Sequence, residues 1–324
     1  MQKLLTIVVP VYKVEKYINK CLDSLIIAPE LMDKMDVLII NDGTPDNSAE
    51  MSREYVKRFP GVFRQIDKEN GGHGSVWNLG VKEAYGKYTR FLDSDDWLEN
   101  LDQLIEKLET CDADLIMTPT LCHCPNEELW VQEIKDMEFG KVYDADTFDW
   151  LGNHSHVNYV FHHSCTYKTD MFRPHLPLFL EKQPYDDVIL GPASKILAHS
   201  LVAYDFILYH YLMDREGQSI SEEVKHRNIE AKIRVEKSAI QFIKNHPLPQ
   251  NSTKYKFYKE KLPKRYNFGY KEFVGFPYKE WKHLIEEWDN WVRQDSPMLK
   301  TKWILLYRCL PQKLYYWISN KIVR

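Results

Sequence analysis

Three carboxylates stand close together in the segment Phe91-Leu-Asp-Ser-Asp-Asp-Trp-Leu98, at Asp93, Asp95 and Asp96. They follow the apolar run 88–92, which has the character of a strand. Oxygen ligands crowded at the end of a strand suit a hard divalent cation, Mg²⁺ or Mn²⁺, which keeps open positions for the oxygens of a diphosphate. A solvated acidic turn is the other interpretation, because such turns are common. These eight residues alone do not separate the two.

A second acidic pair, Asp186-Asp187, precedes the apolar run 188–190, which indicates the start of a helix. A carboxylate here could remove the proton from a hydroxyl nucleophile. It could equally cap the helix, since the helix dipole favours negative charge at that end. The glycine-rich segment 71–74, also before a helix, could present N–H groups to a phosphate or form a simple tight turn.

The elements that must position these residues alternate between strand and helix. Apolar, β-branched runs predict strands at 5–11, 36–40, 62–66 and 88–92, and helical spacing between them predicts helices after Val14 and after Gly74. This alternation predicts an α/β fold with a doubly wound, mostly parallel sheet and helices on both faces. Ligands of such sheets bind beyond the carboxyl ends of the strands, where Asp42 and the 93–96 carboxylates lie.

Four motifs over residues 5–98 resemble those of family 2 glycosyltransferases of the GT-A fold. They are Val8-Val-Pro-Val-Tyr12, Ile40-Asn-Asp-Gly-Thr-Pro-Asp-Asn-Ser48, Asn70-Gly-Gly72 with Asn78 and Gly80, and Phe91-Leu-Asp-Ser-Asp-Asp96. Further on, Tyr185-Asp-Asp-Val188 resembles the acidic pair on the acceptor side, and Arg215-Glu-Gly-Gln-Ser-Ile-Ser221 resembles the loop near the end of the catalytic domain. The resemblance extends over roughly residues 4–222.

The resemblance implies a role for each matching residue. Asp42 would accept a hydrogen bond from the nucleobase of the donor, normally uracil, in a pocket lined by Pro10 and Tyr12. Asp95 would hold the metal ion, and Asp93 would hold the ribose or a metal-bound water. Asp187 would be the base that deprotonates the acceptor hydroxyl.

Some positions depart from the family's pattern. Asn41 replaces the commoner first aspartate of the nucleobase motif, and Asp186 stands where glutamate is usual. Trp77 occupies the position usually held by arginine, after a variant His73-Gly74 lead-in, which puts the contacts to the donor sugar in doubt. His154 and His156 lie between the donor motifs and Asp187, where they could contact the acceptor sugar or support the residues that do. These two histidines are therefore candidates for the acceptor side.

The expected function is that of a metal-dependent, inverting glycosyltransferase, a hexosyltransferase that uses a UDP-sugar and Mn²⁺ or Mg²⁺. A lipid-linked glycan acceptor in bacterial capsular, exopolysaccharide or other surface polysaccharide synthesis is the expected setting. A nucleotidyltransferase is an alternative, but it should carry a Gly-rich, basic loop after the first strand, where this chain has Pro10-Val-Tyr-Lys-Val14. A non-catalytic glycan-binding or scaffold protein would be expected to lose Asp95 or Asp187, and both are present.

The charge is unevenly distributed along the chain. Residues 226–324 contain 21 Lys and Arg against 9 Asp and Glu, although the net charge of the 324 residues is −4. We therefore expect a catalytic domain at 1–225, with a nucleotide-sugar half at about 1–98 and an acceptor half at about 99–225, followed by a basic, mainly helical extension at 226–324. Residues 226–295 are predicted to be helical, with a lysine- and tyrosine-rich link from Lys254 to Tyr270.

The segment 300–324 has six basic residues and no acidic ones, interleaved with Trp303, Tyr307, Tyr315, Tyr316 and Trp317. Basic residues with interfacial aromatics suit an anionic membrane surface, and Trp303, Leu306, Tyr307 and Leu310 fall on one helical face. Packing of this tail on its own domain is the alternative. Nucleic acid is not expected as a partner, because no nucleic-acid motif is present.

Length and composition agree with a soluble enzyme, which the basic tail would hold at the inner face of the cell membrane. No apolar run reaches the roughly 18–20 residues of a membrane span, and no signal peptide is visible, so a cytoplasmic location is expected. Six cysteines lack a disulfide-scaffold spacing, and Cys122-His-Cys124 fits no common zinc motif. Reduced thiols without a structural zinc are the expectation.

Overall fold

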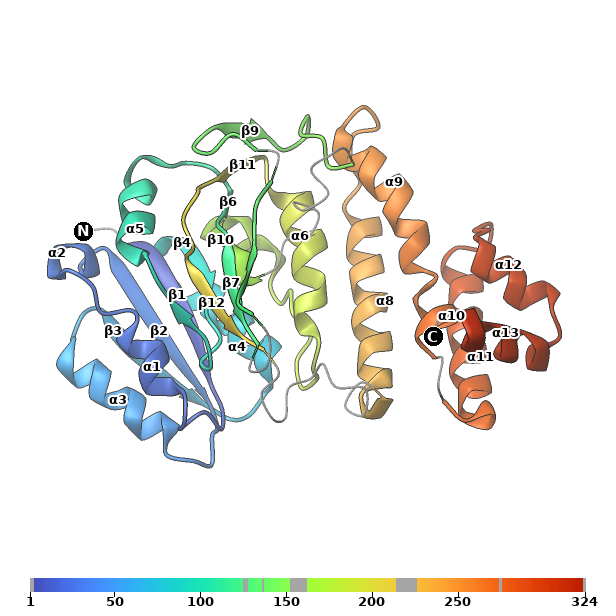
Figure 1. The fold of residues 1–324 in the computed structure, drawn as a ribbon, viewed down its shortest axis with the longest axis horizontal. Helices are drawn as coiled ribbons and strands as arrows, with labels where there is room; N and C mark the ends of the chain where they lie inside the picture. The colour runs from blue at the N-terminus through green and yellow to red at the C-terminus, as the bar shows by residue number, and fades with distance from the viewer. Residues whose placement is uncertain are drawn as a thin grey trace. The chain divides into compact units, whose positions relative to one another are not determined.

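The computed structural model describes residues 3–124, 128–135, 137–151, 162–213, 226–273 and 276–322. The chain separates into two compact units, Met1–Ser219 and Ile220–Arg324. Figure 1 shows the first unit from blue to yellow and the helices of the second in orange and red.

The first unit begins with alternating strands and helices, whose bounds are β1 (Lys3–Val11), α1 (Ile18–Asp23), α2 (Pro29–Met32), β2 (Met35–Asp42), α3 (Ser48–Arg58), β3 (Phe63–Lys68), α4 (His73–Glu83), β4 (Gly86–Phe91), β5 (Trp97–Leu98) and α5 (Leu101–Thr110). It continues with β6 (Leu115–Met117), β7 (Thr120–His123), β8 (Trp130–Gln132), β9 (Val142–Asp144), β10 (Cys165–Lys168), α6 (Leu190–Leu197), β11 (Ser200–Ala203) and β12 (Tyr209–Leu212). Short 3₁₀ helices include η2 (His162–Ser164) and η5 (Asp186–Ile189).

Among the described residues, the larger sheet has eight strands in the order β3-β2-β1-β4-β10-β6-β11-β9. Strands β3, β2, β1 and β4 are parallel, β10 runs antiparallel between β4 and β6, and β11 is again parallel to β6. A smaller sheet has the order β5-β12-β7-β8. The strand order places β1 and β2 at the centre of the parallel half, so the loops after β1, β2 and β4 open at one edge.

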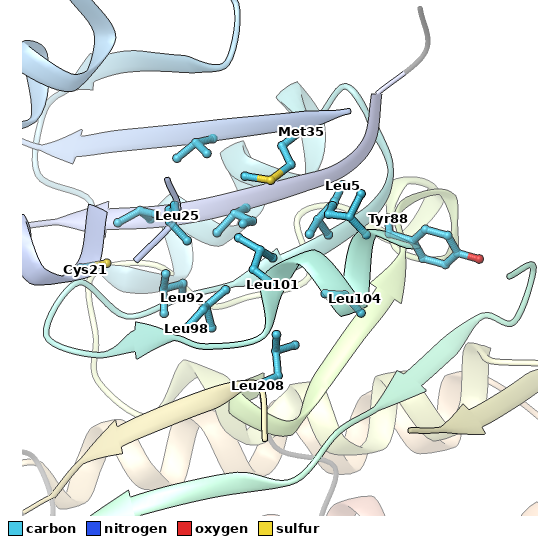
Figure 2. Packing of buried hydrophobic residues seen from close by; sticks show 14 of the residues in the cluster. Leu5, Cys21, Leu25, Met35, Tyr88, Leu92, Leu98, Leu101, Leu104 and Leu208 are labelled. Atoms are coloured by element: carbon cyan, nitrogen blue, oxygen red, sulfur yellow. The ribbon is translucent and has the colours of Figure 1, made fainter. Parts of the chain in front are cut away.

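Helices cover both faces of the larger sheet, because both faces of β1 are apolar. Leu5, Ile7 and Val9 point into a cluster built with α1, α2 and α5, part of which is drawn in Figure 2. On the opposite face, Val8 lies against Gly80 of α4, where any side chain would overlap the valine methyls. The predicted α/β class, with a mostly parallel sheet between two helical layers, is confirmed.

The first helix is shorter than its apolar spacing predicts. We expect a helix from Val14 onward, but α1 begins at Ile18 after a turn in which the N–H groups of Tyr17 and Ile18 both bond to the Val14 carbonyl. The preceding residue Lys13 has a φ of 57° and its N–H bonds to Thr44, so the chain first bends around the end of β2.

The second unit is helical among its described residues, with α8 (Ile229–Asn245), α9 (Thr253–Arg265), α10 (Phe268–Glu272), α11 (Tyr278–Asp295), α12 (Lys302–Cys309) and α13 (Gln312–Ile322). The link predicted at Lys254 to Tyr270 is wrong, because this segment forms α9 and α10. Ser252 caps α9 by accepting a hydrogen bond from the N–H of Tyr255. Helix α9 is rich in lysine and buries few apolar residues, so its sequence lacks the apolar periodicity that indicates a helix.

Four of the five aromatic residues of the C-terminal tail pack into or against the core of this unit, and Trp317 is exposed. Ile304, Tyr307 and Tyr315 are buried together with Trp281 and Trp288 in one cluster. The face formed by Trp303, Leu306, Tyr307 and Leu310 therefore lies against the unit itself. That face is not available to a membrane, which corrects the expected docking surface.

No helix within the described ranges combines the length and apolar character that a bilayer span requires.

Candidate functional site

The acidic turn follows β4 and leads into β5. Oxygens of Asp93, Asp95 and Asp96 lie within 4.8 Å of one another, the spacing of ligands around a single cation. Asp93 and Asp95 are partly exposed, and Asp96 is buried. The three carboxylates therefore differ in how they can meet a ligand.

Asp96 is held inside the protein by β12. Its Oδ2 accepts a 2.7 Å hydrogen bond from the Tyr209 hydroxyl, and its Oδ1 accepts one of 2.8 Å from the backbone N–H of Leu212. Burial and the neighbouring carboxylates of Asp95 and Asp93 raise the pKa of Asp96 to about 9. Asp96 thus joins the two sheets, and Asp93 and Asp95 are the partly exposed members of the group.

Two histidines hold Asp93. Nε2 of His73 lies 3.2 Å from its Oδ1, and Nε2 of His162 lies 3.1 Å from its Oδ2. Burial alone would raise the pKa of Asp93, but the two imidazoles outweigh it and hold this pKa well below its usual range. Asp93 is therefore a fixed, ionised carboxylate.

His73 is the first residue of α4 and also reaches the acceptor side. Its Nδ1 lies 3.1 Å from Oδ2 of Asp186, so one imidazole contacts a carboxylate of the acidic turn after β4 and a carboxylate of η5. Burial lowers the pKa of His73, but Asp186 and Asp93 outweigh this effect and raise it well above its usual value. The bridge gathers the two acidic motifs at one place.

The indole ring of Trp77 packs against the imidazole rings of both histidines. It is fully buried and stacks on Phe91 at a centroid distance of 4.2 Å, and its ring lies 4.3 Å from His73 and 5.3 Å from His162. Where the resemblance leads one to expect an arginine, this chain therefore has a flat apolar support for two imidazoles.

The acidic pair of η5 divides into an inner and an outer carboxylate. Asp186 is buried at 3% exposure and faces His73, whereas Asp187 is exposed. The surrounding protein desolvates Asp187 and raises its pKa, Asp186 adds to this, and His162 and His73 oppose it. A raised pKa makes Asp187 a better proton acceptor than an ordinary aspartate.

The geometry gives Asp42 a different surrounding from the nucleobase pocket expected for it. Its carboxylate is 3% exposed, and its oxygens accept hydrogen bonds from the N–H groups of Gly71 and Gly72 and from Lys68, at 2.9, 2.8 and 2.5 Å. Asp42 therefore braces the glycine-rich loop before α4.

Pro10 and Tyr12 lie at the end of β1, as the motif requires, and Tyr12 is 43% exposed. Asn41 pairs with Val11 in the sheet, and its amide donates to Asp67 at the end of β3. The polar surface at this edge is therefore made by Asn41 and Asp67 beside Tyr12.

The glycine-rich loop lies against the segment that precedes η5. A Cβ on Gly74 would overlap the carbonyl oxygen of Leu180, and one on Gly72 would lie 3.1 Å from the backbone nitrogen of Lys182. Asn78 accepts hydrogen bonds from the N–H groups of Leu178 and Phe179, at 2.9 and 3.0 Å. These motif residues therefore fasten the donor-side loop to the acceptor-side segment.

Sequence reasoning found Asp93, Asp95, Asp186 and Asp187, and the structure brings Asp93 and Asp186 together on one imidazole. From the sequence, His73 is only a departure from the glycine-rich motif of the family. Nothing in the residues around His162 indicates that it contacts Asp93. The candidates His154 and His156, and the loop Arg215–Ser221, lie outside the described residues.

Comparison with known proteins agrees with this arrangement. The profile of the family described as "Glycosyl transferase family 2" matches residues 6–173, more than half of the chain. This match includes β1 to β4, the acidic turn and His162.

The chain is 30% identical to EpsH of Bacillus subtilis (strain 168), described as a glycosyltransferase, over 221 residues. The match covers 64% of this chain and 60% of EpsH, so it spans less than two thirds of that relative.

Solved structures share the fold at low sequence identity. Residues 1–349 of TarS from S. aureus, solved in complex with UDP, superimpose with a TM-score of 0.66 at 16% identity, covering 99% of this chain and 90% of that one. The mannosyltransferase PcManGT from Pyrobaculum calidifontis, solved with GDP-Man and Mn²⁺, gives 0.53 at 11% identity, covering 98% and 84%. With the family match over β1 to β10 and this shared fold, the chain belongs to glycosyl transferase family 2.

Proposed function

We propose that this protein transfers a sugar from a UDP-sugar to a hydroxyl group of a glycan acceptor, with inversion at the anomeric carbon. The observation that supports this most is the bridge through His73, which sets the donor-side carboxylate Asp93 beside the acceptor-side pair Asp186-Asp187. Residues 1–225 would form the catalytic part.

In this proposal Asp187 is the general base. It is exposed, its pKa is raised by desolvation, and it lies next to the buried Asp186. Deprotonation of the acceptor hydroxyl by Asp187 would let the oxygen attack the anomeric carbon while the diphosphate leaves from the other side. One displacement of this kind inverts the configuration.

A divalent cation fits the acidic turn, because Asp93 and Asp95, partly exposed and clustered with the buried Asp96, offer the hard oxygen ligands that Mn²⁺ and Mg²⁺ prefer. Asp95, assisted by Asp93, would hold the ion. When bound, such an ion neutralises the charge that develops on the leaving diphosphate.

The nucleobase would lie at the carboxyl edge of β1 to β3, beside Pro10 and Tyr12. Asp42 is buried against the glycine-rich loop, so we assign the polar contacts to the base to Asn41 and Asp67, which are also hydrogen-bonded but reach the surface. The UDP bound to TarS supports uridine, whereas the GDP-Man bound to PcManGT makes guanosine the alternative to test.

We further propose a lipid-linked acceptor of bacterial polysaccharide synthesis, used at the inner face of the cell membrane. One face of α13 supports this setting. Leu314, Trp317 and Ile322 are 44%, 55% and 64% exposed, and Lys313 and Lys321 lie among them. Apolar side chains flanked by lysines fit an anionic lipid surface.

The test is product analysis by mass spectrometry with a panel of UDP- and GDP-sugars, a lipid-linked acceptor and Mn²⁺. We expect one UDP-sugar to add a single residue of its sugar to the acceptor. Transfer from a GDP-sugar alone would overturn the nucleobase assignment, and nucleotide incorporation in place of sugar would favour a nucleotidyltransferase.

A further inference from the structure

The imidazole of His73 contacts a donor-side and an acceptor-side carboxylate, Asp93 at 20 residues and Asp186 at 113 residues along the chain. We propose that His73 is a positioning residue for sugar transfer, which acts through Asp186 to set the direction of Asp187. This inference rests on the proposed function, since it concerns the same site.

The bridge is built into the backbone on both sides. Lys182 donates its N–H to the carbonyl of Gly71 at 2.6 Å, two residues before His73. Gly74, the second residue of α4, lies against the same segment and leaves no space for a Cβ beside the carbonyl oxygen of Leu180. The backbone before η5 therefore lies directly on the start of α4, and the imidazole has little freedom to turn away from Asp186.

The two histidines on Asp93 are not equivalent. His162 contacts one oxygen of Asp93, whereas His73 contacts the other oxygen and Asp186 as well. Removal of His73 would leave Asp93 with one imidazole and would leave the buried Asp186 without this partner. Removal of His162 would leave the bridge to Asp186 in place.

The contact between His73 and Asp186 can set the direction of Asp187 because Asp186 is the first residue of η5, the short helix that also contains Asp187. Tyr185, the residue before it, has a left-handed φ of 67°, so the chain turns sharply here. A buried carboxylate anchored at this turn fixes the direction in which the next side chain projects. An exposed Asp187 without that anchor would sample positions away from the acceptor hydroxyl.

The experiment is a double-mutant cycle on the transfer rate of the full chain. His73→Ala and Asp186→Ala should each lower kcat by ~10–100-fold, and the double variant should be no slower than the slower single variant, because both remove one link. The Kd of UDP measured with Mn²⁺ by calorimetry should stay within about 3-fold in His73→Ala, since His162 still holds Asp93.

His162→Ala is the matched control, because it removes an imidazole from the same carboxylate without touching Asp186. Its effect should multiply with that of Asp186→Ala within about 3-fold. His73→Asn, whose amide nitrogen takes the place of Nδ1, should recover part of the rate, and His73→Gln, which imitates Nε2, should recover less. Multiplicative effects of His73→Ala and Asp186→Ala, or loss of UDP binding in His73→Ala, would overturn the positioning role.

A second measurement does not depend on activity. Hydrogen–deuterium exchange at residues 183–190 should become at least about 3-fold faster in His73→Ala and stay unchanged in His162→Ala. If the wild type transfers no sugar, the proposed function fails while this measurement still decides the bridge. Equal exchange in all three proteins would refute the inference even if transfer is found.

Discussion

Tyr209 of β12 donates a 2.7 Å hydrogen bond to Asp96, the last carboxylate of the acidic turn. The bond joins the smaller sheet to the turn after β4 and leaves Asp96 only 1% exposed. The three neighbouring aspartates thus have different surroundings: Asp96 ties two sheets together, Asp93 is held by two histidines, and Asp95 is the ligand that we propose for a cation.

This division predicts opposite results for two neighbouring substitutions. Asp95→Ala should abolish turnover, because the charge of the leaving diphosphate loses its metal-bound partner, and excess EDTA should silence the wild type. Asp96→Asn keeps the shape and an acceptor for the N–H of Leu212, so it should retain activity within about 10-fold. Steady-state transfer assays check both variants, and an active Asp95→Ala with a silent Asp96→Asn would reverse the assignment.

Replacement of the proposed base should affect chemistry and spare binding. Asp187→Asn keeps the size of the side chain and removes the proton acceptor, so kcat should fall by ~10²–10⁴-fold. UDP affinity measured by calorimetry should hardly change, because Asp187 lies on the acceptor side. If this variant transfers at the wild-type rate, another group is the base.

The pH dependence of transfer should show the raised pKa of Asp187. A base works only when deprotonated, so kcat should fall as the pH falls through this pKa. Because desolvation raises it, the acid limb should lie above the usual aspartate value of about 3.9. Rates measured from about pH 4 to about pH 8 test this, and the residual activity of Asp187→Asn should lack the limb.

The membrane proposal can be tested with point variants in the intact chain. Trp317→Ser, and separately the pair Lys313→Glu and Lys321→Glu, should release the protein from phosphatidylglycerol vesicles, since each lysine near such a surface contributes roughly 1 kcal/mol. Neither change touches the buried cluster of the unit. Sedimentation with anionic and neutral vesicles gives the measurement.

Leu129→Ser, at a 58% exposed position of the other unit, is the control and should bind vesicles like the wild type. Truncation after Met298 is a poor test of the same idea. It removes Ile304, Tyr307 and Tyr315 from the core, so we expect the helical unit to unfold. Undiminished vesicle binding by the point variants would exclude the α13 face as the contact.

Much of the fold was predictable because its signals are local. The apolar runs of β1, β2 and β4 have the length and β-branched content of buried strands, and the acidic turn and Asp186-Asp187 stand out by charge alone. Strands joined by helices run parallel and have their carboxyl ends at the same edge of the sheet, whatever their side chains. The common position of the loops after β1, β2 and β4 could therefore be predicted.

The rest depends on contacts between distant residues. Nothing near Asp42 in the sequence shows that the N–H groups of Gly71 and Gly72 occupy its oxygens. His162 gains its meaning only from the folded position of Asp93, 69 residues earlier. In the tail, amphipathic spacing correctly indicated an apolar face, but spacing does not tell whether that face meets lipid or the protein's own core.

The close contact between the glycine-rich loop and the backbone before η5 limits how this enzyme could be re-engineered or could diverge. A segment borrowed from a relative would have to follow the same path over Gly72 and Gly74, where even a Cβ on either glycine would crowd its backbone. It would also need backbone groups in register with Asn78. Chimeras that exchange residues 177–190 should therefore fold more often when residues 70–78 are exchanged with them. The two separated segments should accordingly change together among relatives.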